Sequence, residues 1–158
     1  MQSKEELTDN LAAKYAQLTA DEAPKVYPAS KRTLALVVAW LIPGAGHLVL
    51  GKYGRAAMFF LTITAAFMIG LALHGRLFWP LQPTVENSSS PDFVSFLWFF
   101  AQIGTGLCYL FCYALGINTI PTPNAPTYEY ANALTCLAGL LNYLVIHDVF
   151  DIAAGRKK

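Results

Sequence analysis

Apolar and charged positions along the chain separate a polar amino-terminal region from four long stretches without a charged residue. These stretches cover residues 33–51, 56–75, 93–128 and 130–147. A membrane core about 30 Å thick needs roughly 20 apolar residues in a helix. The pattern therefore predicts an all-α fold, a polytopic membrane bundle of four helical segments at 34–50, 56–74, 93–117 and 131–149. Strands are not expected, because no stretch alternates apolar and polar residues as a membrane barrel requires.

The first segment, Leu34 to Leu50, differs from the others because Pro43 and Gly44 lie in its middle. Proline removes a backbone donor and clashes with the preceding helical turn, so we expect the helix to kink or break near 41–44. Two arrangements stay open. The segment is either a kinked span or a re-entrant hairpin that enters and leaves on one side of the membrane.

The amino-terminal region, residues 1–32, has a different pattern. Ser3 and Glu6 have the spacing of a capping box, and apolar residues follow at helical intervals: Leu7, Leu11, Tyr15 and Leu18. This predicts an amphipathic helix over about 4–19, either lying on the membrane surface or on a partner, or solvated and of marginal stability. A linker that contains proline, 20–32, leads into the transmembrane domain, residues 33–158.

Composition supports a membrane protein. Hydrophobic residues make up 55% of the 158 positions and charged residues 13%, against about 25% charged residues in a soluble domain. The net charge is only +1, and the basic residues form no broad face. These values exclude a soluble globular enzyme and a nucleic-acid-binding protein. The expected partners are the lipid bilayer and either other membrane protein subunits or a second copy of the chain.

The distribution of basic residues predicts an orientation. Four spans with a cytoplasmic amino terminus put seven basic residues of the region 25–158 inside, against Lys52 and Arg55 outside. A re-entrant first segment would put five of these basic residues inside and four outside. The positive-inside rule therefore favours four spans, in a multi-pass protein of the bacterial inner (cytoplasmic) membrane with both termini cytoplasmic. The basic 51–55 turn fits this arrangement poorly.

A glycine-rich turn follows the proline of the first segment and carries the first group of candidate site residues: Pro43, Gly44, Gly46, His47, Gly51, Lys52, Gly54 and Arg55. Glycines permit tight turning and close backbone approach, and irregular backbone at membrane depth must be buried or line water. The polar side chains then either form a pocket for an anionic lipid head group or a partner, or serve the turn itself. A single histidine is weak evidence for a metal or haem.

A second polar group, near the end of the last segment, comprises His147, Asp148 and Asp151, with Arg76 as the expected partner of Asp148 across helices. Charges at membrane depth are costly and need partners. We interpret the group as an interfacial ion-pair cluster; metal binding or proton relay is the alternative. Three cysteines lie inside predicted helices, where packing is their expected role. Gly70, Thr135 and Gly139 lie on small-residue faces that predict close helix packing.

The pattern W-L-I-P-G-A-G-H-x-x-x-G-K-x-G-R-A, residues 40–56, and the carboxy-terminal L-L-N-Y-L-V-I-H-D-V-F-D-I-A-A-G-R-K-K resemble small bacterial membrane proteins of a domain-of-unknown-function family. The resemblance covers residues 31–75 and 128–158. More remotely, the glycine-rich turn is similar to that of the two-transmembrane-segment domain. The resemblance implies a bacterial membrane protein and supplies no activity, cofactor or catalytic residue.

The sequence contains no nucleophile–base pair, phosphate loop or metal-binding spacing, so we expect no enzyme, no catalytic or metal-binding residue and no cofactor. The leading hypothesis is a scaffold or an accessory subunit of a larger membrane complex. One alternative is a small transporter or channel that uses the broken first helix, with a path lined by His47, Thr62, Gln102 and Asn142. The other is a haem- or chlorophyll-binding subunit with His47, His74 or His147 as ligand.

Overall fold

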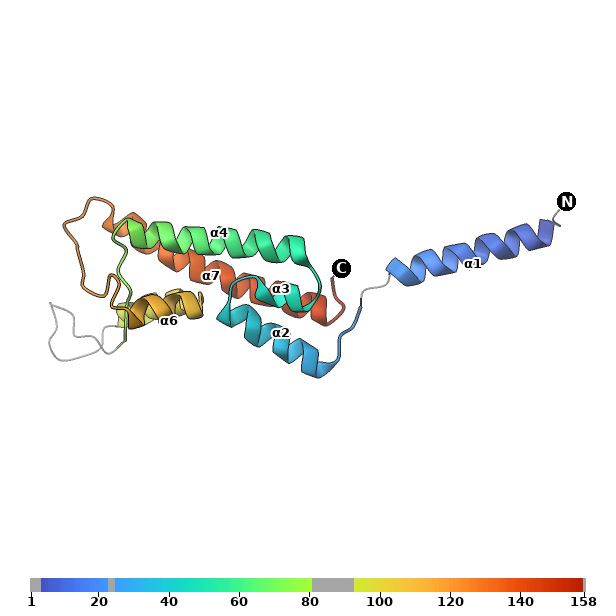
Figure 1. Cartoon of the computed structure of the whole chain (residues 1–158), viewed down its shortest axis with the longest axis horizontal. Coiled ribbons are helices and arrows are strands. Elements are labelled where there is room, and N and C mark those ends of the chain that lie inside the picture. The colour runs from blue at the N-terminus through green and yellow to red at the C-terminus, as the bar shows by residue number, and fades with distance from the viewer. Residues whose placement is uncertain (1–3, 23–24, 81–92, 158) are drawn as a thin grey trace.

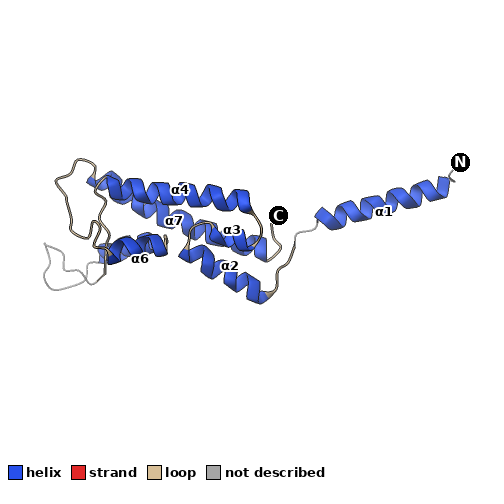
Figure 2. Cartoon of the chain, viewed as in Figure 1, coloured by secondary structure: helices blue, strands red, loops and turns tan. Residues whose placement is uncertain are grey.

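The computed structural model describes residues 4–22, 25–80 and 93–157. Within these ranges every regular element is a helix (Figure 2), which confirms the all-α fold. The helices, in chain order, are α1 (Lys4–Glu22), α2 (Ala29–Leu41), α3 (Ala45–Val49), α4 (Tyr53–Ala72), α5 (Phe93–Ile103), α6 (Leu107–Ala114) and α7 (Tyr128–Ala153).

Helices α4 and α7 form the long axis of the bundle and lie side by side (Figure 1). With 20 and 26 residues, both are long and apolar enough to cross a membrane. α7 covers the predicted segment 131–149, and α4 covers 56–72 of the predicted segment 56–74. A side chain at Gly70 of α4 would collide with Thr135 and the backbone of Ala131 on α7, which confirms that these small residues permit close helix packing.

Helices α2 and α3 form a hairpin. The predicted break is confirmed, since α2 ends at Leu41 and α3 begins after Gly44, which has a φ of 77°. Figure 1 shows α3 running back along α2. The Tyr27 hydroxyl, just before α2, donates a hydrogen bond of 3.1 Å to the carbonyl of Leu50, just after α3. The hairpin therefore begins and ends at the same end of the bundle.

Helices α5 and α6 form a second hairpin, and the prediction of one helix over 93–117 was wrong. The two helices are bent by 118° at the break 104–106. Gly104, Thr105 and Gly106 terminate α5, and Gly106 has a φ of 61°, which favours glycine. A third candidate span exists only if this bent pair is counted as one. Apolar composition alone did not predict the break, because glycine is common in continuous membrane helices.

The two hairpins enter the bundle from opposite ends, and their breaks meet beside α7 (Figure 1). Gly106 lies so close to the carbonyl groups of Trp40 and Leu41 that a Cβ atom would not fit. The fully buried Asn142 of α7 donates to the carbonyls of Ala39 at 3.0 Å and Gly104 at 2.8 Å. One amide thus satisfies a carbonyl from each broken helix.

The 51–55 turn lies at the same end of the bundle as the start of α2 and the end of α7, so its predicted position opposite the termini was wrong. Tyr27 bonds to Ala153 through its backbone, and Arg55 lies 3.9 Å from Asp148. We call this end the basic end. Within the described ranges 25–80 and 93–157 its basic residues are Lys25, Lys31, Arg32, Lys52, Arg55, Arg156 and Lys157. Arg76 lies at the other end. Two opposed hairpins therefore divide the charge more unequally than either arrangement weighed from the sequence.

The predicted amino-terminal helix over about 4–19 is confirmed as α1, which projects away from the bundle (Figure 1). Ser3 of the predicted capping box lies outside the described residues. Leu11 and Tyr15, which define the predicted apolar face, are exposed. The helix presents this face to the surroundings and not to α2–α7.

We predict that Asn142→Leu lowers the free energy of unfolding in detergent by about 1–3 kcal/mol, because the carbonyls of Ala39 and Gly104 lose their donor. Denaturant titration of the full chain measures this. Leu140→Ala, at a lipid-accessible position of the same helix that is 49% exposed, is the control and should have a much smaller effect. Equal losses in the two variants would contradict the proposed role of the amide.

Candidate functional site at the basic end

The break between α2 and α3 places His47 in the interior. Pro43 is fully buried, and Gly44 fits against the backbone of Ala56 and Phe60 on α4. A side chain at Gly46 would collide with Ala35 and Ala39 of α2. The predicted Pro-Gly-x-Gly turn therefore lets the short helix α3 pack tightly between α2 and α4. This packing buries His47 completely, 5.2 Å from the ring of Phe59 between ring centroids.

His47 is bound to Asp148 of α7. Its Nε2 lies 3.1 Å from Oδ2 of Asp148. An ionised carboxylate only accepts hydrogen bonds, so Nε2 carries a proton and donates it to Asp148. The Nδ1 atom is buried and has no hydrogen-bond partner among the described residues. The imidazole thus links α3 to α7 through its Nε2 atom.

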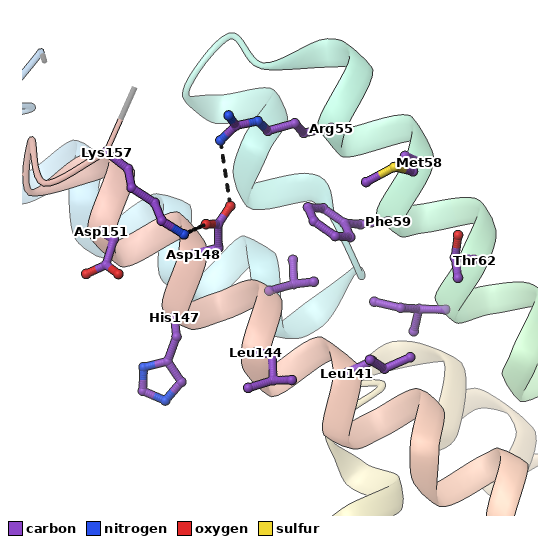
Figure 3. Close-up of a pocket in the computed structure, with 12 residues that line it drawn as sticks. Arg55, Met58, Phe59, Thr62, Leu141, Leu144, His147, Asp148, Asp151 and Lys157 are labelled. Carbon is purple, nitrogen blue, oxygen red and sulfur yellow. Dashed lines mark hydrogen bonds and ion pairs between the residues drawn. The ribbon is translucent and has the colours of Figure 1, made fainter.

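The carboxylate of Asp148 also faces two cations (Figure 3). Lys157 Nζ donates to Oδ1 at 2.7 Å, and Arg55 Nη1 lies 3.9 Å from Oδ2. Lys157 reaches this position because the chain turns back after α7 at Gly155, which has a φ of 70°. The hydrogen bond and the attraction of the Asp148 carboxylate raise the pKa of Lys157. Asp148 therefore joins the first hairpin, the start of α4 and the carboxy-terminal tail.

A groove of about 980 Å³ runs along α4 and α7 from this charged cluster. Its apolar part is lined by Met58, Phe59, Ile63, Leu141, Leu144 and Val145, with Thr62 on the α4 side. Arg55, His147, Asp148, Asp151 and Lys157 line its other part, at the basic end. Figure 3 shows these side chains along the two helices. The groove therefore combines a charged mouth with an apolar floor.

The two polar groups predicted from the sequence are largely one site in the structure. His47 and Arg55 of the first group meet Asp148 of the second, although 101 positions separate His47 from Asp148. Asp151 pairs with Arg156 at 3.5 Å, and His147 is exposed. Gly51, with a φ of 77°, forms the turn before Lys52, the residue that precedes α4. Nothing in the structure explains a glycine at position 54, where a side chain would meet open space.

Arg76 does not belong to this cluster, and its predicted pairing with Asp148 was wrong. Its backbone amide donates to Asn132 at 2.7 Å, near the start of α7. Sixteen residues of helix, about 24 Å, separate Asn132 from Asp148. The prediction rested on four spans, which would have brought the end of the second segment beside the end of the fourth. In the structure α4 ends where α7 begins.

Sequence reasoning missed a buried polar network at the opposite end of the bundle. Gln102 accepts from the amide of Phe78 at 3.0 Å and donates to the carbonyl of Arg76 and the hydroxyl of Thr135. The Tyr109 hydroxyl donates to the carbonyl of Phe78 at 2.5 Å. These side chains bind the backbone of 76–78 to the second hairpin. A glutamine inside an apolar stretch was the available signal.

The remaining candidate ligands are dispersed. His74, which has a φ of 69°, is exposed at the end of α4 opposite His47. Cys108, Cys112 and Cys136 are free thiols in the described part of the chain. The described residues contain no group of three metal-binding side chains.

Comparison with known proteins identifies the family. The family of unknown function DUF6677 matches residues 34–158. The chain belongs to this family. The match begins within α2, so the DUF6677 region includes both hairpins, α4 and α7, and leaves α1 outside. Neither the comparison with curated proteins nor that with solved structures found a match.

We predict that His47 and Asp148 are coupled by about 1–3 kcal/mol in a double-mutant cycle, because the imidazole is fully buried. The variants are His47→Leu, Asp148→Asn and their combination, compared by denaturant titration. The same cycle with Lys157→Gln is the matched control and should give a smaller coupling, because water screens this exposed ion pair. A His47–Asp148 coupling no larger than the control would show that the buried contact contributes nothing to stability.

Proposed function

We propose that the chain is a non-enzymatic multi-pass protein of the bacterial inner membrane that acts by binding, as a scaffold or an accessory subunit of a larger membrane complex. The observation that carries the proposal is the basic end. It gathers the charged site, the entrance of the groove and the carboxy-terminal end of the projecting helix α1 on one side of the bundle (Figure 1). Binding surfaces for a partner and for the membrane surface are thus available together.

The charge distribution supports cytoplasmic termini. The DUF6677 bundle has its described basic residues at one end, except Arg76. Basic residues near membrane helices remain on the cytoplasmic side. We therefore orient the basic end toward the cytoplasm, with α4 and α7 as spans and the two hairpins as re-entrant elements. Hairpins of this kind are compatible with lipid because their irregular backbone is buried in protein.

The buried polar residues favour binding over transport. The side chains of His47, Gln102 and Asn142 are fully buried and bonded within the protein. Thr62, the fourth residue of the transport path considered above, lines the α4–α7 groove instead. The four side chains therefore do not share one cavity, and the first three are occupied in linking helices.

We predict that residues 52 and 156 are labelled from one side of the membrane and residue 124 from the other. The test uses the full chain without its three native cysteines, with Lys52→Cys, Arg156→Cys or Asn124→Cys, and an impermeant maleimide. In intact cells only Asn124→Cys should react, and permeabilisation should expose the other two. Labelling of Lys52→Cys together with Asn124→Cys in intact cells would support four spans and contradict this topology.

We predict that a stable partner co-purifies with the full chain from native membranes and depends on the apolar face of α1. Leu11→Glu combined with Tyr15→Glu should reduce its recovery at least about tenfold, because burying two charges against an apolar surface is costly. Asn10→Glu combined with Gln17→Glu adds the same charge on another face of α1 and should retain the partner. Migration of the wild-type protein at monomer mass, with no co-purifying protein, would contradict the scaffold proposal.

A further inference from the structure

We propose that the α4–α7 groove binds an acidic phospholipid, with the phosphate at Arg55 and an acyl chain along the apolar floor. The proposal rests on the membrane location in the proposed function and adds the chemistry of a ligand. It does not depend on a protein partner, because the groove lies entirely within the DUF6677 region of one chain.

The charge at the mouth of the groove is complementary to a phosphate. Both carboxylates there already have a cation nearer than Arg55. Lys157 lies 2.7 Å from Asp148, and Arg156 lies 3.5 Å from Asp151. Lys52 and Arg55 add two further positive charges at this end. The charged residues of the groove lining balance, with Arg55 and Lys157 against Asp148 and Asp151. Arg156 and Lys52 nearby give the surrounding basic end an excess of cations, which a bound anion would offset.

Arg55 is the residue best placed to bind the phosphate. Its guanidinium has five N–H donors, and its one ion pair within the described residues, to Asp148, is 3.9 Å long. That distance exceeds a hydrogen bond, so the donors remain available. The side chain is 46% exposed and lines the groove. Arginine pairs with phosphate oxygens in bidentate geometry.

The apolar floor runs in the direction of an acyl chain. Arg55 and Thr62 are seven residues apart on α4, and Asp148 and Leu141 are seven apart on α7. Each interval spans about 10 Å of helix, directed from the charged mouth toward the middle of the bundle. Ile63, Leu141 and Val145 form part of this floor. A soluble anion would use the mouth and leave the floor uncovered, whereas a phospholipid covers both.

The depth of the site agrees with this ligand. Basic pockets between membrane helices on the cytoplasmic side bind acidic lipid head groups. The basic end holds Arg55 in the first turn of α4, at the level where head groups meet a helix that begins at the membrane surface. The groove lies alongside α4 and α7, the two candidate spans.

Native mass spectrometry of the purified full chain in detergent tests the proposal, with dioleoyl phosphatidylglycerol and dioleoyl phosphatidylcholine as probes. Their acyl chains are identical, so the comparison isolates head-group charge. We expect the acidic lipid to bind about tenfold more tightly. Arg55→Gln should remove this preference, and Arg55→Lys should retain most of it because the charge remains. Lys52→Gln, at the same end but outside the groove lining, should change affinity less than twofold.

A second pair of variants tests the apolar floor. Thr62→Trp fills the groove and should weaken both lipids about tenfold. Leu61→Trp, at a neighbouring position that is 65% exposed and outside the groove lining, should leave both unchanged. Thermal unfolding of each variant checks that the fold is retained.

Several outcomes would overturn the proposal. Equal affinity for the two lipids, or equal effects of Arg55→Gln and Lys52→Gln, would show that the groove does not select an acidic head group. An unchanged affinity in Thr62→Trp, or displacement of the lipid by equimolar glycerol phosphate, would indicate a soluble-anion site. A dimer mass that excludes lipid would indicate that a second copy occupies the groove. These measurements use the purified chain, so the lipid proposal can fail while a partner still co-purifies from membranes. Equally, lipid binding can be found although no partner co-purifies.

Discussion

The need to satisfy backbone carbonyl groups inside an apolar bundle is the constraint on which this structure depends. A broken helix loses hydrogen bonds at the break, and lipid supplies none in return. Asn142 meets this need for both hairpins at once, with bonds to Ala39 and Gly104. The close fit of Gly106 against Trp40 and Leu41 brings the two breaks near enough for one amide to reach both. Without that amide, each hairpin would have a buried carbonyl group without this donor.

Polar side chains in this protein have two distinct uses. In the interior, Gln102 and Asn142 bind backbone groups and hold irregular segments against regular helices. At the basic end, Asp148 is the centre of a network that reaches from buried His47 to exposed Lys157. The exposed cation Arg55 retains N–H donors for a ligand, whereas the side-chain amide donors of Gln102 and Asn142 are bonded within the protein. The functional proposals therefore concern the basic end.

The charged site could be predicted in part. The Pro-Gly-x-Gly break, His47, Arg55 and Asp148 were each recognised as candidates from residue type and position. Their assembly was not, because a contact between positions 47 and 148 depends on which end of α7 faces the first hairpin. The assumption of four spans paired Asp148 with Arg76, about 24 Å of helix from it. Lys157 was not among the candidate site residues, since the turn at Gly155 that returns it to Asp148 is a local backbone feature.

The sequence by itself determined the helical class, the approximate positions of α1, α4 and α7, the break after Leu41 and the presence of helices long and apolar enough to cross a membrane. Length and hydropathy decide these properties because the lipid core constrains each segment separately. Only the tertiary structure decided that α5 and α6 double back, that the hairpins enter from opposite ends and that the two polar groups form one site. These features depend on contacts between distant segments: whether a glycine pair bends a helix is decided by what packs against it, here the carbonyl groups of α2 and the amide of Asn142.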